Sequence, residues 1–509
     1  MFEKKMDRRS FIKTVAVGAV AAGASPVLFK EAAAAPVPNK WDKEADVVII
    51  GAGAAGLMAA VQANTAGKKA LILEKAANAF HSSSTISGGY FAAAGTKAQK
   101  AAGINDSVEK MYNDIQKFGG FMNYPHLLKL FCENSAEAYN FVYDNKLAFL
   151  RVEPTGGHGT PRAHRSKSFT GRDYIEALLK VIQDRKIAIE YNANVTRLFY
   201  DDKKQGVVGV EVTTKGKKSN VKASTSVILA SGGFSGNVKK LDNWIPAYAG
   251  NGVVIGGSGS DGEGIMMAVR DVGTPTTHMQ YSATYPMGIE SGKRSGPMAR
   301  YYFWTPLGAI IVNQEGKRYI DEFTPATKIT PELAKQTGKV HYVVLDSAMW
   351  DAALKQYPAE VLFCLPSWSM DRVNEEIKKE NVLFKADSIE EVATKAKIDP
   401  RNLAETVSRY NQYVDNKKDL DFGRKTLPNK LQKGPFYLVK MTFWTCLTLG
   451  GIRVNDKLQV LDAFDKVVKG LYAAGEAVGG IHGDTYLFGC AFGWAHTSGW
   501  IAGKNAVKG

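Results

Sequence analysis

The chain has 509 residues, of which 45% are hydrophobic, 10% aromatic and 23% charged. This composition is that of a globular protein and excludes a disordered, collagen-like or disulfide-scaffold chain. The 65 Lys and Arg exceed the 50 Asp and Glu by 15, so nucleic acid, an anionic surface or an acidic protein has to be considered as a partner.

The first 35 residues have the pattern of an export signal. Arg8 and Arg9 precede a mildly apolar stretch at 14–29 and a small-residue tract at 32–35, which is the order found in twin-arginine signal peptides. The apolar stretch is too short and too rich in Gly and Ala to span a bilayer comfortably. We therefore predict twin-arginine export and a periplasmic location. Cleavage near Ala34 removes six Lys/Arg and three Asp/Glu and leaves a net charge of +12.

A strand, turn, helix and strand open the mature chain. The apolar run Asp46–Ile50 leads into the glycine turn Gly51–Gly56, and a helical pattern continues to Ala66. A second apolar run, 70–73, ends at Glu74. This is the βαβ fingerprint of dinucleotide binding, about 30 residues long.

Each part of this unit has a physical role. Gly51 makes the tight turn, Gly53 lets a pyrophosphate approach the main chain, and Gly56 lets helix and strand pack closely. The helix N-terminus attracts the phosphates, and Glu74 can accept hydrogen bonds from the ribose hydroxyls. The unit alone serves NAD and FAD equally. Two later glycine turns, at 227–234 and 470–480, are typical of a two-part FAD-binding domain, where Glu476 reaches the ribityl region.

The residue patterns exclude several other cofactors. The four cysteines lie far apart without a CxxC pair or a CxxCH motif, so neither a zinc ribbon nor an attached c-type haem is expected. The histidines show no metal-ligand spacing, and we predict no metal. Among them only His482, beside the late glycine turn, is a candidate for a place near the flavin.

The sequence resembles a known family in several specific blocks. These are the ISGGYFAAAGT run after 82–84, the PRAHR segment 161–165, the glycine-rich run around Asp261, the GAIIVNQEGKRYIDE segment 308–322, and LGGIRV from Leu449. From about Asp46 to Gly503 the chain resembles the flavoprotein part of the soluble flavocytochrome c fumarate reductases, within the fumarate reductase and succinate dehydrogenase flavoprotein superfamily.

This resemblance implies an α/β fold: a Rossmann-like, glutathione-reductase-like FAD-binding domain with an inserted α+β capping domain. The expected order is a signal peptide at 1–35, the FAD-binding domain at 42–279 and 449–509, and the capping domain at 280–448. The cofactor is FAD. The implied contacts are Gly51, Gly53, Ala54, Ala55, Gly56, Glu74, Lys75, Ser82, Ser83, Gly88, Gly89, Ala230, Ser231, Gly232, Asp261, Glu476, Gly489, Cys490, Ala491 and Phe492. The serines near 83 could instead be turn formers, and the run 256–264 could be a linker.

The substrate positions depart from the family consistently. By alignment, the family's proton-relay Glu and Arg, its proton-donating Arg, its two substrate His and its carboxylate-binding Arg become Tyr302, Thr305, Ala326, Tyr285, Leu447 and Tyr486. A buried substrate carboxylate without a paired cation costs several kcal/mol. We therefore expect fumarate and succinate not to be substrates.

Aromatic residues stand near many of these positions. They suggest a slot for a flat, mostly apolar molecule with a carbonyl or phenolic oxygen, lined by Tyr285, Tyr301, Tyr302, Phe303, Trp304 and Tyr486, with Leu447. The segment Gly483–Tyr486 also resembles the GHTY segment of 3-ketosteroid Δ1-dehydrogenases, in which the tyrosine bonds the substrate carbonyl. This resemblance makes Tyr486 the first catalytic candidate.

We predict a periplasmic FAD-dependent oxidoreductase acting on CH–CH bonds, which reduces the C=C bond of an unsaturated, largely apolar or aromatic carbonyl compound. Hydride passes from flavin N5 to the β-carbon, while Tyr486 and a nearby main-chain N–H stabilise the enolate and Tyr302 or Tyr285 protonates the α-carbon. Two alternatives stay open: a ketosteroid-dehydrogenase-like enzyme working oxidatively, and an electron-transfer flavoprotein subunit. The sequence leaves open the exact compound and whether FAD is covalently bound.

The expected partners follow from the charge pattern. The Lys-rich stretches at 203–204, 215–218, 378–379 and 417–418 have the character of hairpin tips and solvated helix faces and lack interleaved aromatics, so nucleic acid is not expected. No membrane span is expected in the mature chain. Because no haem is expected on this chain, we predict a separate periplasmic cytochrome c as electron donor, docking on the basic surface.

Overall fold

The computed structural model describes residues 36–365 and 367–509, so the predicted signal peptide lies outside the described residues. The chain forms two compact units. Unit 1 comprises the chain up to Lys240 together with Gly256–Ser282 and Leu447–Gly509, and unit 2 comprises Leu241–Ile255 and Ala283–Cys446. The predicted α/β fold is confirmed. Residues 241–255, which the sequence prediction assigned to the first FAD-binding segment, belong to unit 2.

Unit 1 is built on an eight-stranded sheet with the strand order β18-β19-β8-β9-β1-β2-β6, to which β7 adds beside β8. β1 pairs in parallel with both β2 and β9, so it lies in the interior of the sheet. Its last four residues are buried, which explains the continuous apolar run in the sequence. The strands are β1 (Lys43–Ile50), β2 (Ala70–Leu73), β6 (Ala188–Glu190), β7 (Ala193–Asp201), β8 (Gly206–Thr214), β9 (Lys217–Leu229), β18 (Gln459–Leu461) and β19 (Val467–Ala473).

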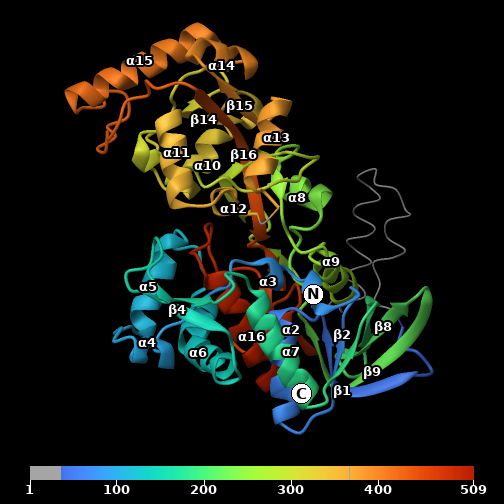
Figure 1. Ribbon diagram of the computed structural model, residues 1–509. Coiled ribbons are helices and arrows are strands. Elements are labelled where there is room, and N and C mark those ends of the chain that lie inside the picture. The colour runs from blue at the N-terminus through green and yellow to red at the C-terminus, as the bar shows by residue number, and fades with distance from the viewer. Residues whose placement is uncertain (1–35, 366) are drawn as a thin grey trace, which may run out of the picture. The chain divides into compact units, whose positions relative to one another are not determined.

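Helices pack on this sheet, and α2 (Ala54–Thr65) contacts both α16 (Cys490–Ala506) and α7 (Arg172–Asp184) (Figure 1). α2 is buried from Ala54 to Ala63, which explains why it is apolar on all sides. The other elements of unit 1 are α3 (Ser83–Ile86), α4 (Lys97–Ala101), α5 (Val108–Phe118), α6 (Pro125–Asp144), α8 (Val238–Trp244, which continues into unit 2), α9 (Glu263–Val272), β3 (Tyr90–Ala92), β4 (Phe149–Glu153), β5 (Ala163–Ser166), β11 (Thr276–Thr277) and β17 (Gly451–Ile452).

Unit 2 is organised around the long strand β16 (Phe436–Thr448), which pairs with β10, β12, β14 and β15. Its remaining strands are β10 (Val253–Val254), β12 (Ser282–Gly288), β13 (Ile310–Asn313), β14 (His341–Asp346) and β15 (Leu383–Ala386). Its helices are α10 (Ala326–Leu333), α11 (Ser347–Gln356), α12 (Ala359–Leu362), α13 (Met370–Lys379), α14 (Ile389–Lys395) and α15 (Pro400–Asn416). The pairing of β10 with Trp444 and Thr445 on β16 explains why 241–255 belongs to this unit.

The core of unit 2 combines aromatic stacking with a buried ionic cluster. Trp350 stacks on Tyr437 with 4.4 Å between ring centroids. Arg318 pairs with Glu322 at 2.8 Å and with Asp419 at 3.0 Å, and all three side chains are almost completely buried. Arg424 also binds Glu322, at 3.0 Å, so the cluster joins two cations to two anions.

The predicted positions of the basic stretches are confirmed. Lys203 and Lys204 lie in the turn between β7 and β8, Lys215 follows β8, Lys378 and Lys379 end α13, and Lys417 caps α15. Across 36–365 and 367–509, no helix combines the length and the apolar character that crossing a bilayer requires.

Candidate active site

Three parallel strands bring the three predicted glycine turns to one edge of the sheet in unit 1. Ile50 of β1 lies opposite Leu229 of β9, and Leu229 lies opposite Ala473 of β19. The carboxyl ends of these strands therefore align, and a glycine-rich segment follows each of them. In open α/β sheets ligands bind beyond the carboxyl ends of the strands.

The first turn fits a pyrophosphate. Gly51 has φ +106°, and a Cβ there would lie 2.5 Å from the carbonyl oxygen of Ala230, so only glycine is tolerated. Gly53 precedes α2 without any side-chain cap, and the atoms nearest to a Cβ built on it are 3.6 Å away, on Ser82 and Ser84. The main-chain donors at this helix N-terminus thus have space for a phosphate in front of them.

The acidic residue after β2 is held by the same turn. Glu74 accepts the Ala52 N–H at 2.7 Å and the Ala76 N–H at 2.8 Å, one on each carboxylate oxygen. Each oxygen keeps a further lone pair, so the carboxylate can also accept ribose hydroxyls. The Ser84 hydroxyl accepts the N–H of Ala54, the first residue of α2, at 3.2 Å. The sequence reasoning did not select Ser84.

The glycine-rich run 256–264 is fixed to the first turn region and is not a loose linker. Lys75 forms an ion pair with Asp261 at 2.6 Å. Ser83 accepts the Gly257 N–H at 2.9 Å, and its hydroxyl bonds that of Ser260 at 2.8 Å. Lys75, Ser83 and Asp261 are therefore brought together from distant parts of the sequence. Ser260 completes this set, although no sequence pattern distinguishes it from the neighbouring serines.

Glu476 lies in a compact network after β19. One of its carboxylate oxygens accepts both the main-chain N–H of Thr448, at 2.8 Å, and the Thr448 hydroxyl, at 2.9 Å. Burial raises the pKa of the Glu476 carboxyl, while the bonds from Thr448 and the Gly233 main chain oppose that rise. Sequence reasoning missed Thr448. Its signal was its place directly before the LGGIRV segment, which begins at Leu449.

The remaining cofactor candidates divide into main-chain and core positions. The Ala230 N–H bonds Ile50 O at 2.9 Å, and the buried Ser231 hydroxyl has no hydrogen-bond partner within the described part of the chain. Gly489 has φ +83° and precedes α16 without a side-chain cap. The side chains of Cys490 and Phe492 are buried in the core, so only their main-chain atoms can contact a cofactor.

Together these features fit FAD. A dinucleotide with two phosphates and a ribityl chain requires helix N-termini and hydrogen-bonding groups. Here two helix N-termini follow glycine cap residues, a carboxylate acceptor lies after β2 and another after β19, and one buried hydroxyl is unsatisfied. Gly51 to Gly56, Glu74, Ser83, Asp261 and Glu476 would hold it. Within 36–365 and 367–509 no group of three or more His, Cys, Asp or Glu side chains is placed to hold a metal ion.

The first catalytic candidate, Tyr486, lies in unit 1 on the loop before α16. Its phenol oxygen accepts the Gly489 N–H at 2.6 Å, and its half-buried ring stands edge-on to His482 with 5.7 Å between centroids. Burial lowers the pKa of His482 to about 3, so this histidine is neutral and adds no cation. Tyr302 and Tyr285 both lie in unit 2, Tyr302 in a short 3-10 helix with 43% of its surface exposed and Tyr285 half-buried on β12.

The predicted aromatic slot is wrong for two of its members. Tyr301 and Trp304 are 2% and 0% exposed and belong to the core of unit 2. Phe303 stacks on Tyr357 with 4.2 Å between centroids. Successive residues of a 3-10 helix point in directions about 120° apart, so the run 301–304 cannot present all its rings to one surface.

The arginines near the aligned substrate positions are bound to other groups. Arg424 donates to the carbonyl oxygens of Thr305 and Ala309 as well as to Glu322. Arg300 donates to the Val361 carbonyl at 2.8 Å and to Cys364 Sγ at 3.1 Å. These guanidinium groups are used within the fold of unit 2.

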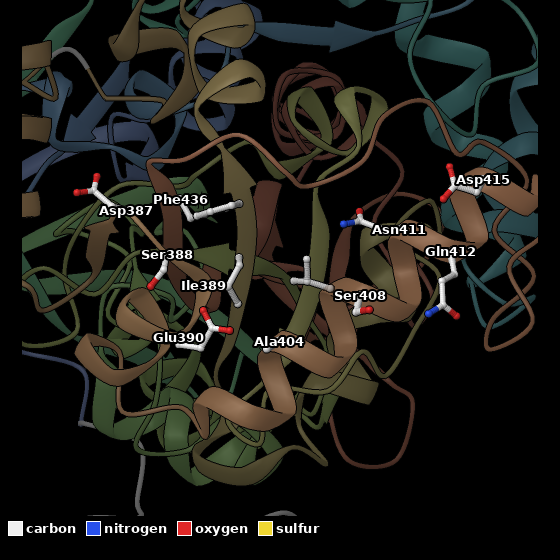
Figure 2. Close-up of a pocket in the computed structure, with 11 residues that line it drawn as sticks. Asp387, Ser388, Ile389, Glu390, Ala404, Ser408, Asn411, Gln412, Asp415 and Phe436 are labelled. Atoms are coloured by element: carbon white, nitrogen blue, oxygen red, sulfur yellow. The ribbon is translucent and has the colours of Figure 1, made fainter.

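A surface groove of unit 2 is a different feature. It has a volume of about 510 Å³ and is lined by α14, α15 and the start of β16 (Figure 2). Asp387, Glu390 and Asp415 give it an acidic wall, and Lys430 pairs with Asp415 at 2.5 Å. No predicted site residue lines it, so it is not a candidate for the reaction.

Comparisons with known proteins agree with this geometry. Residues 46–490 match the family described as "FAD binding domain". A fumarate reductase (cytochrome) from Shewanella frigidimarina is 31% identical over 482 residues, which cover 94% of this chain and 79% of that protein. The acrylate reductase flavoprotein subunit of Shewanella woodyi is 29% identical over 503 residues, with coverage of 96% and 95%.

Solved structures give the same answer for the fold. The open conformation of a flavocytochrome c3 fumarate reductase superposes with a TM-score of 0.78 and 29% identity, covering 97% of this chain and 81% of that chain. A 3-ketosteroid-Δ4-(5α)-dehydrogenase from Rhodococcus jostii RHA1 in complex with 4-androstene-3,17-dione superposes with a TM-score of 0.73 and 24% identity, covering 94% and 99%. At that identity the second likeness concerns the fold alone.

Proposed function

Because the chain belongs to the FAD-binding family of the fumarate reductase flavoproteins and is an FAD-dependent oxidoreductase acting on C=C bonds, we propose that it reduces an unsaturated, largely apolar or aromatic carbonyl compound other than fumarate. In this proposal unit 1 binds FAD, as the FAD-binding domain, and unit 2 is the capping domain. Acrylate reductase among the relatives supports a substrate that is not a dicarboxylate.

The observation that carries the proposal is the missing cation at the aligned substrate positions. Tyr285, Tyr302, Thr305, Ala326, Leu447 and Tyr486 stand there, and the nearby Arg300, Arg318 and Arg424 are committed to partners in the core of unit 2. A substrate carboxylate at these positions would be desolvated without a guanidinium to pair with it. A carbonyl oxygen, in contrast, needs only a hydrogen-bond donor.

Tyr486 supplies such a donor in the proposed mechanism. The Gly489 N–H donates to the phenol oxygen at 2.6 Å, and a phenol oxygen that accepts a hydrogen bond still carries an O–H donor. This bond stabilises negative charge on the phenol oxygen, which makes Tyr486 a stronger donor to a carbonyl that develops enolate character. When bound and reduced by the electron donor, FAD would supply the hydride for the β-carbon. Tyr302 or Tyr285 delivers the proton to the α-carbon, so one C=C bond takes up a hydride and a proton.

An anaerobic assay tests this function. The FAD-loaded protein is supplied with a reduced viologen and a panel of enones, cinnamates, steroids and fumarate, and viologen oxidation is followed. We expect turnover with at least one apolar unsaturated carbonyl compound and little with fumarate. Rapid fumarate reduction would contradict the substrate proposal. Turnover of saturated steroids with an oxidised acceptor, without the reverse reaction, would favour the oxidative alternative.

We also propose that the protein is exported by the twin-arginine route and receives electrons from a separate cytochrome c. Arg8 and Arg9 support export, and the basic surplus of the mature chain, which falls mainly in unit 1, supports docking of an acidic donor. Replacement of both arginines by lysine should keep the protein in the cytoplasm. Reduction by a candidate cytochrome should slow as ionic strength rises, and a rate independent of salt would contradict the docking proposal.

A further inference from the structure

A single peptide group lies between the Tyr486 phenol and a histidine. The N–H of the Phe488–Gly489 peptide donates to Tyr486 Oη at 2.6 Å. The carbonyl oxygen of the same peptide is 2.8 Å from Nε2 of His158, which lies far away in sequence, in the segment before β5. Both ends of this peptide are therefore held by side chains, and all of these residues belong to unit 1.

The neighbours of His158 determine its tautomer. Its Nδ1 lies 3.3 Å from Nη1 of Arg162. A guanidinium can only donate and a carbonyl can only accept, so Nδ1 must be the bare nitrogen and Nε2 must carry the hydrogen. Burial lowers the pKa of His158, and the positive charge of Arg162 lowers it further. The bond to the Phe488 carbonyl and the nearby aspartates raise it, but the net shift is downward. The ring is thus a neutral donor to the Phe488 carbonyl.

Arg162 is in turn immobile. Its side chain is 0% exposed, and it binds Asp106 through Nε at 3.0 Å and through Nη2 at 2.8 Å. Nη1 also binds Asp114 at 2.6 Å. Asp114 accepts the Gly159 N–H at 2.8 Å, which fixes the chain directly after His158. The ionic cluster therefore holds the imidazole by its ring nitrogen and by its main chain.

We propose that His158 is a positioning residue for Tyr486, acting through the Phe488–Gly489 peptide. A peptide group is planar, so fixing the direction of its carbonyl also fixes the direction of its N–H. Hydrogen bonds at both ends of one peptide polarise it cooperatively, so the bond from His158 makes the Gly489 N–H a better donor to the phenol oxygen. His158 thereby orients Tyr486 and increases its acidity. The importance of this for turnover rests on the proposed function, whereas the link itself does not.

Nuclear magnetic resonance tests the link without a substrate. In FAD-loaded protein labelled with carbonyl-13C phenylalanine and 15N glycine, only Phe–Gly peptides give a doubly selected amide signal, and the chain contains four, at 118–119, 422–423, 488–489 and 492–493. Tyr486→Phe identifies the Gly489 signal, because it removes the acceptor of that N–H. His158→Phe keeps an aromatic ring but removes both ring nitrogens.

We expect His158→Phe to shift the Gly489 amide proton upfield, in the same direction as Tyr486→Phe, while the Gly423 signal stays in place. His158→Gln should restore most of the shift, because its amide offers a donor and an acceptor. Should the phenylalanine variant fail to fold, His158→Asn provides the test, since its amide is one methylene too short to reach the Phe488 carbonyl. An unmoved Gly489 signal in a folded variant overturns the proposal.

Kinetics separates this inference from the proposed function. With the panel compound that the wild-type protein reduces fastest, His158→Phe should lower kcat roughly three- to tenfold, the range for loss of one hydrogen bond. It should cause no further loss in a Tyr486→Phe background. If His158→Phe shifted the Gly489 signal but Tyr486→Phe kept full turnover, the catalytic role of Tyr486 would be contradicted, whereas the link through the peptide would remain supported. If Tyr486→Phe lowered turnover but His158→Phe neither shifted the Gly489 signal nor lowered kcat, only the link through the peptide would be contradicted.

Discussion

Both units contain buried arginines, and they use them differently. In unit 2, Arg318 and Arg424 bind Glu322, Asp419 and nearby carbonyl groups, so the cluster is closed within the core. In unit 1, Arg162 binds two aspartates but also contacts His158, and through it the loop that carries Tyr486. The cluster of unit 2 therefore supports the fold, and that of unit 1 extends to the candidate site.

The comparison also concerns the kind of group that each unit offers to a ligand. Unit 1 assembles main-chain N–H groups, uncapped helix N-termini and single carboxylates around the ends of parallel strands. Unit 2 buries Arg318 and Arg424 in its core, and the aligned substrate positions there carry aromatic and small side chains. In the proposed function, unit 1 would recognise the phosphates of FAD, and unit 2 would lack the cations that bind a substrate carboxylate.

The largest expected effect is on the stability of unit 2. Arg424→Met leaves Glu322 with one cation and frees three carbonyl groups, and removing one partner of a buried ionic cluster costs about 3–5 kcal/mol. The free energy of unfolding, measured in urea, should fall by that amount. Lys335→Met, which removes an exposed ion pair, should change it by less than about 1 kcal/mol. Equal effects of the two variants would show that the buried cluster has no special role.

The second effect separates cofactor binding from stability. Gly53→Val should weaken FAD binding about a hundredfold, because the new side chain occupies the space in which a pyrophosphate approaches α2. The measurement is the flavin absorbance retained per protein and its titration with FAD. Gly156→Val is the matched control, since Gly156 also has open space around a built Cβ but lies in an exposed loop. Retention of FAD by Gly53→Val would contradict the assigned phosphate site.

The third effect concerns the chemistry alone. Tyr486→Phe should leave FAD bound and lower turnover at least about tenfold, since it removes the hydroxyl that is proposed to bond the substrate carbonyl. The measurement is viologen oxidation with the preferred panel compound. Tyr301→Phe is the control in unit 2, where the ring is buried in the core and the hydroxyl is expected to play no part in turnover. Unchanged turnover of Tyr486→Phe would remove this residue from the mechanism.

The sequence predicted unit 1 better than unit 2 for a physical reason. The glycine turn Gly51–Gly56 and the strand Ala70–Leu73 follow from local patterns, because tight turns and buried parallel strands restrict the residues that can form them. Thr448 and Ser260 were missed because a hydroxyl becomes part of a site only through a partner that is distant in sequence.

The prediction for unit 2 failed where it depended on the directions in which side chains point. The run 301–304 was interpreted as one aromatic surface, but its 3-10 geometry sends Tyr301 and Trp304 into the core while Tyr302 stays exposed. The assignment of 241–255 depended on long-range pairing, because β10 joins β16 almost two hundred residues later. Composition carried no sign of either arrangement.

The smallest expected effect is a pH dependence at the edge of unit 1. The Lys69 N–H and the Ser224 hydroxyl, each at 2.8 Å, lower the pKa of Asp46 below its ordinary value of 3.8. Because the folded value is the lower one, the ionised carboxylate stabilises the fold above pH 3.8, and this contribution is lost as the pH falls through the folded value. Asp46→Asn should therefore lower the free energy of unfolding by less than about 1 kcal/mol near neutral pH. The difference in this free energy between the variant and the wild type should shrink below pH 3.8. Urea unfolding across this range, with the exposed Glu405→Gln as control, measures it. A difference that stayed constant with pH would show that the charge on Asp46 does not contribute to the stability of the fold.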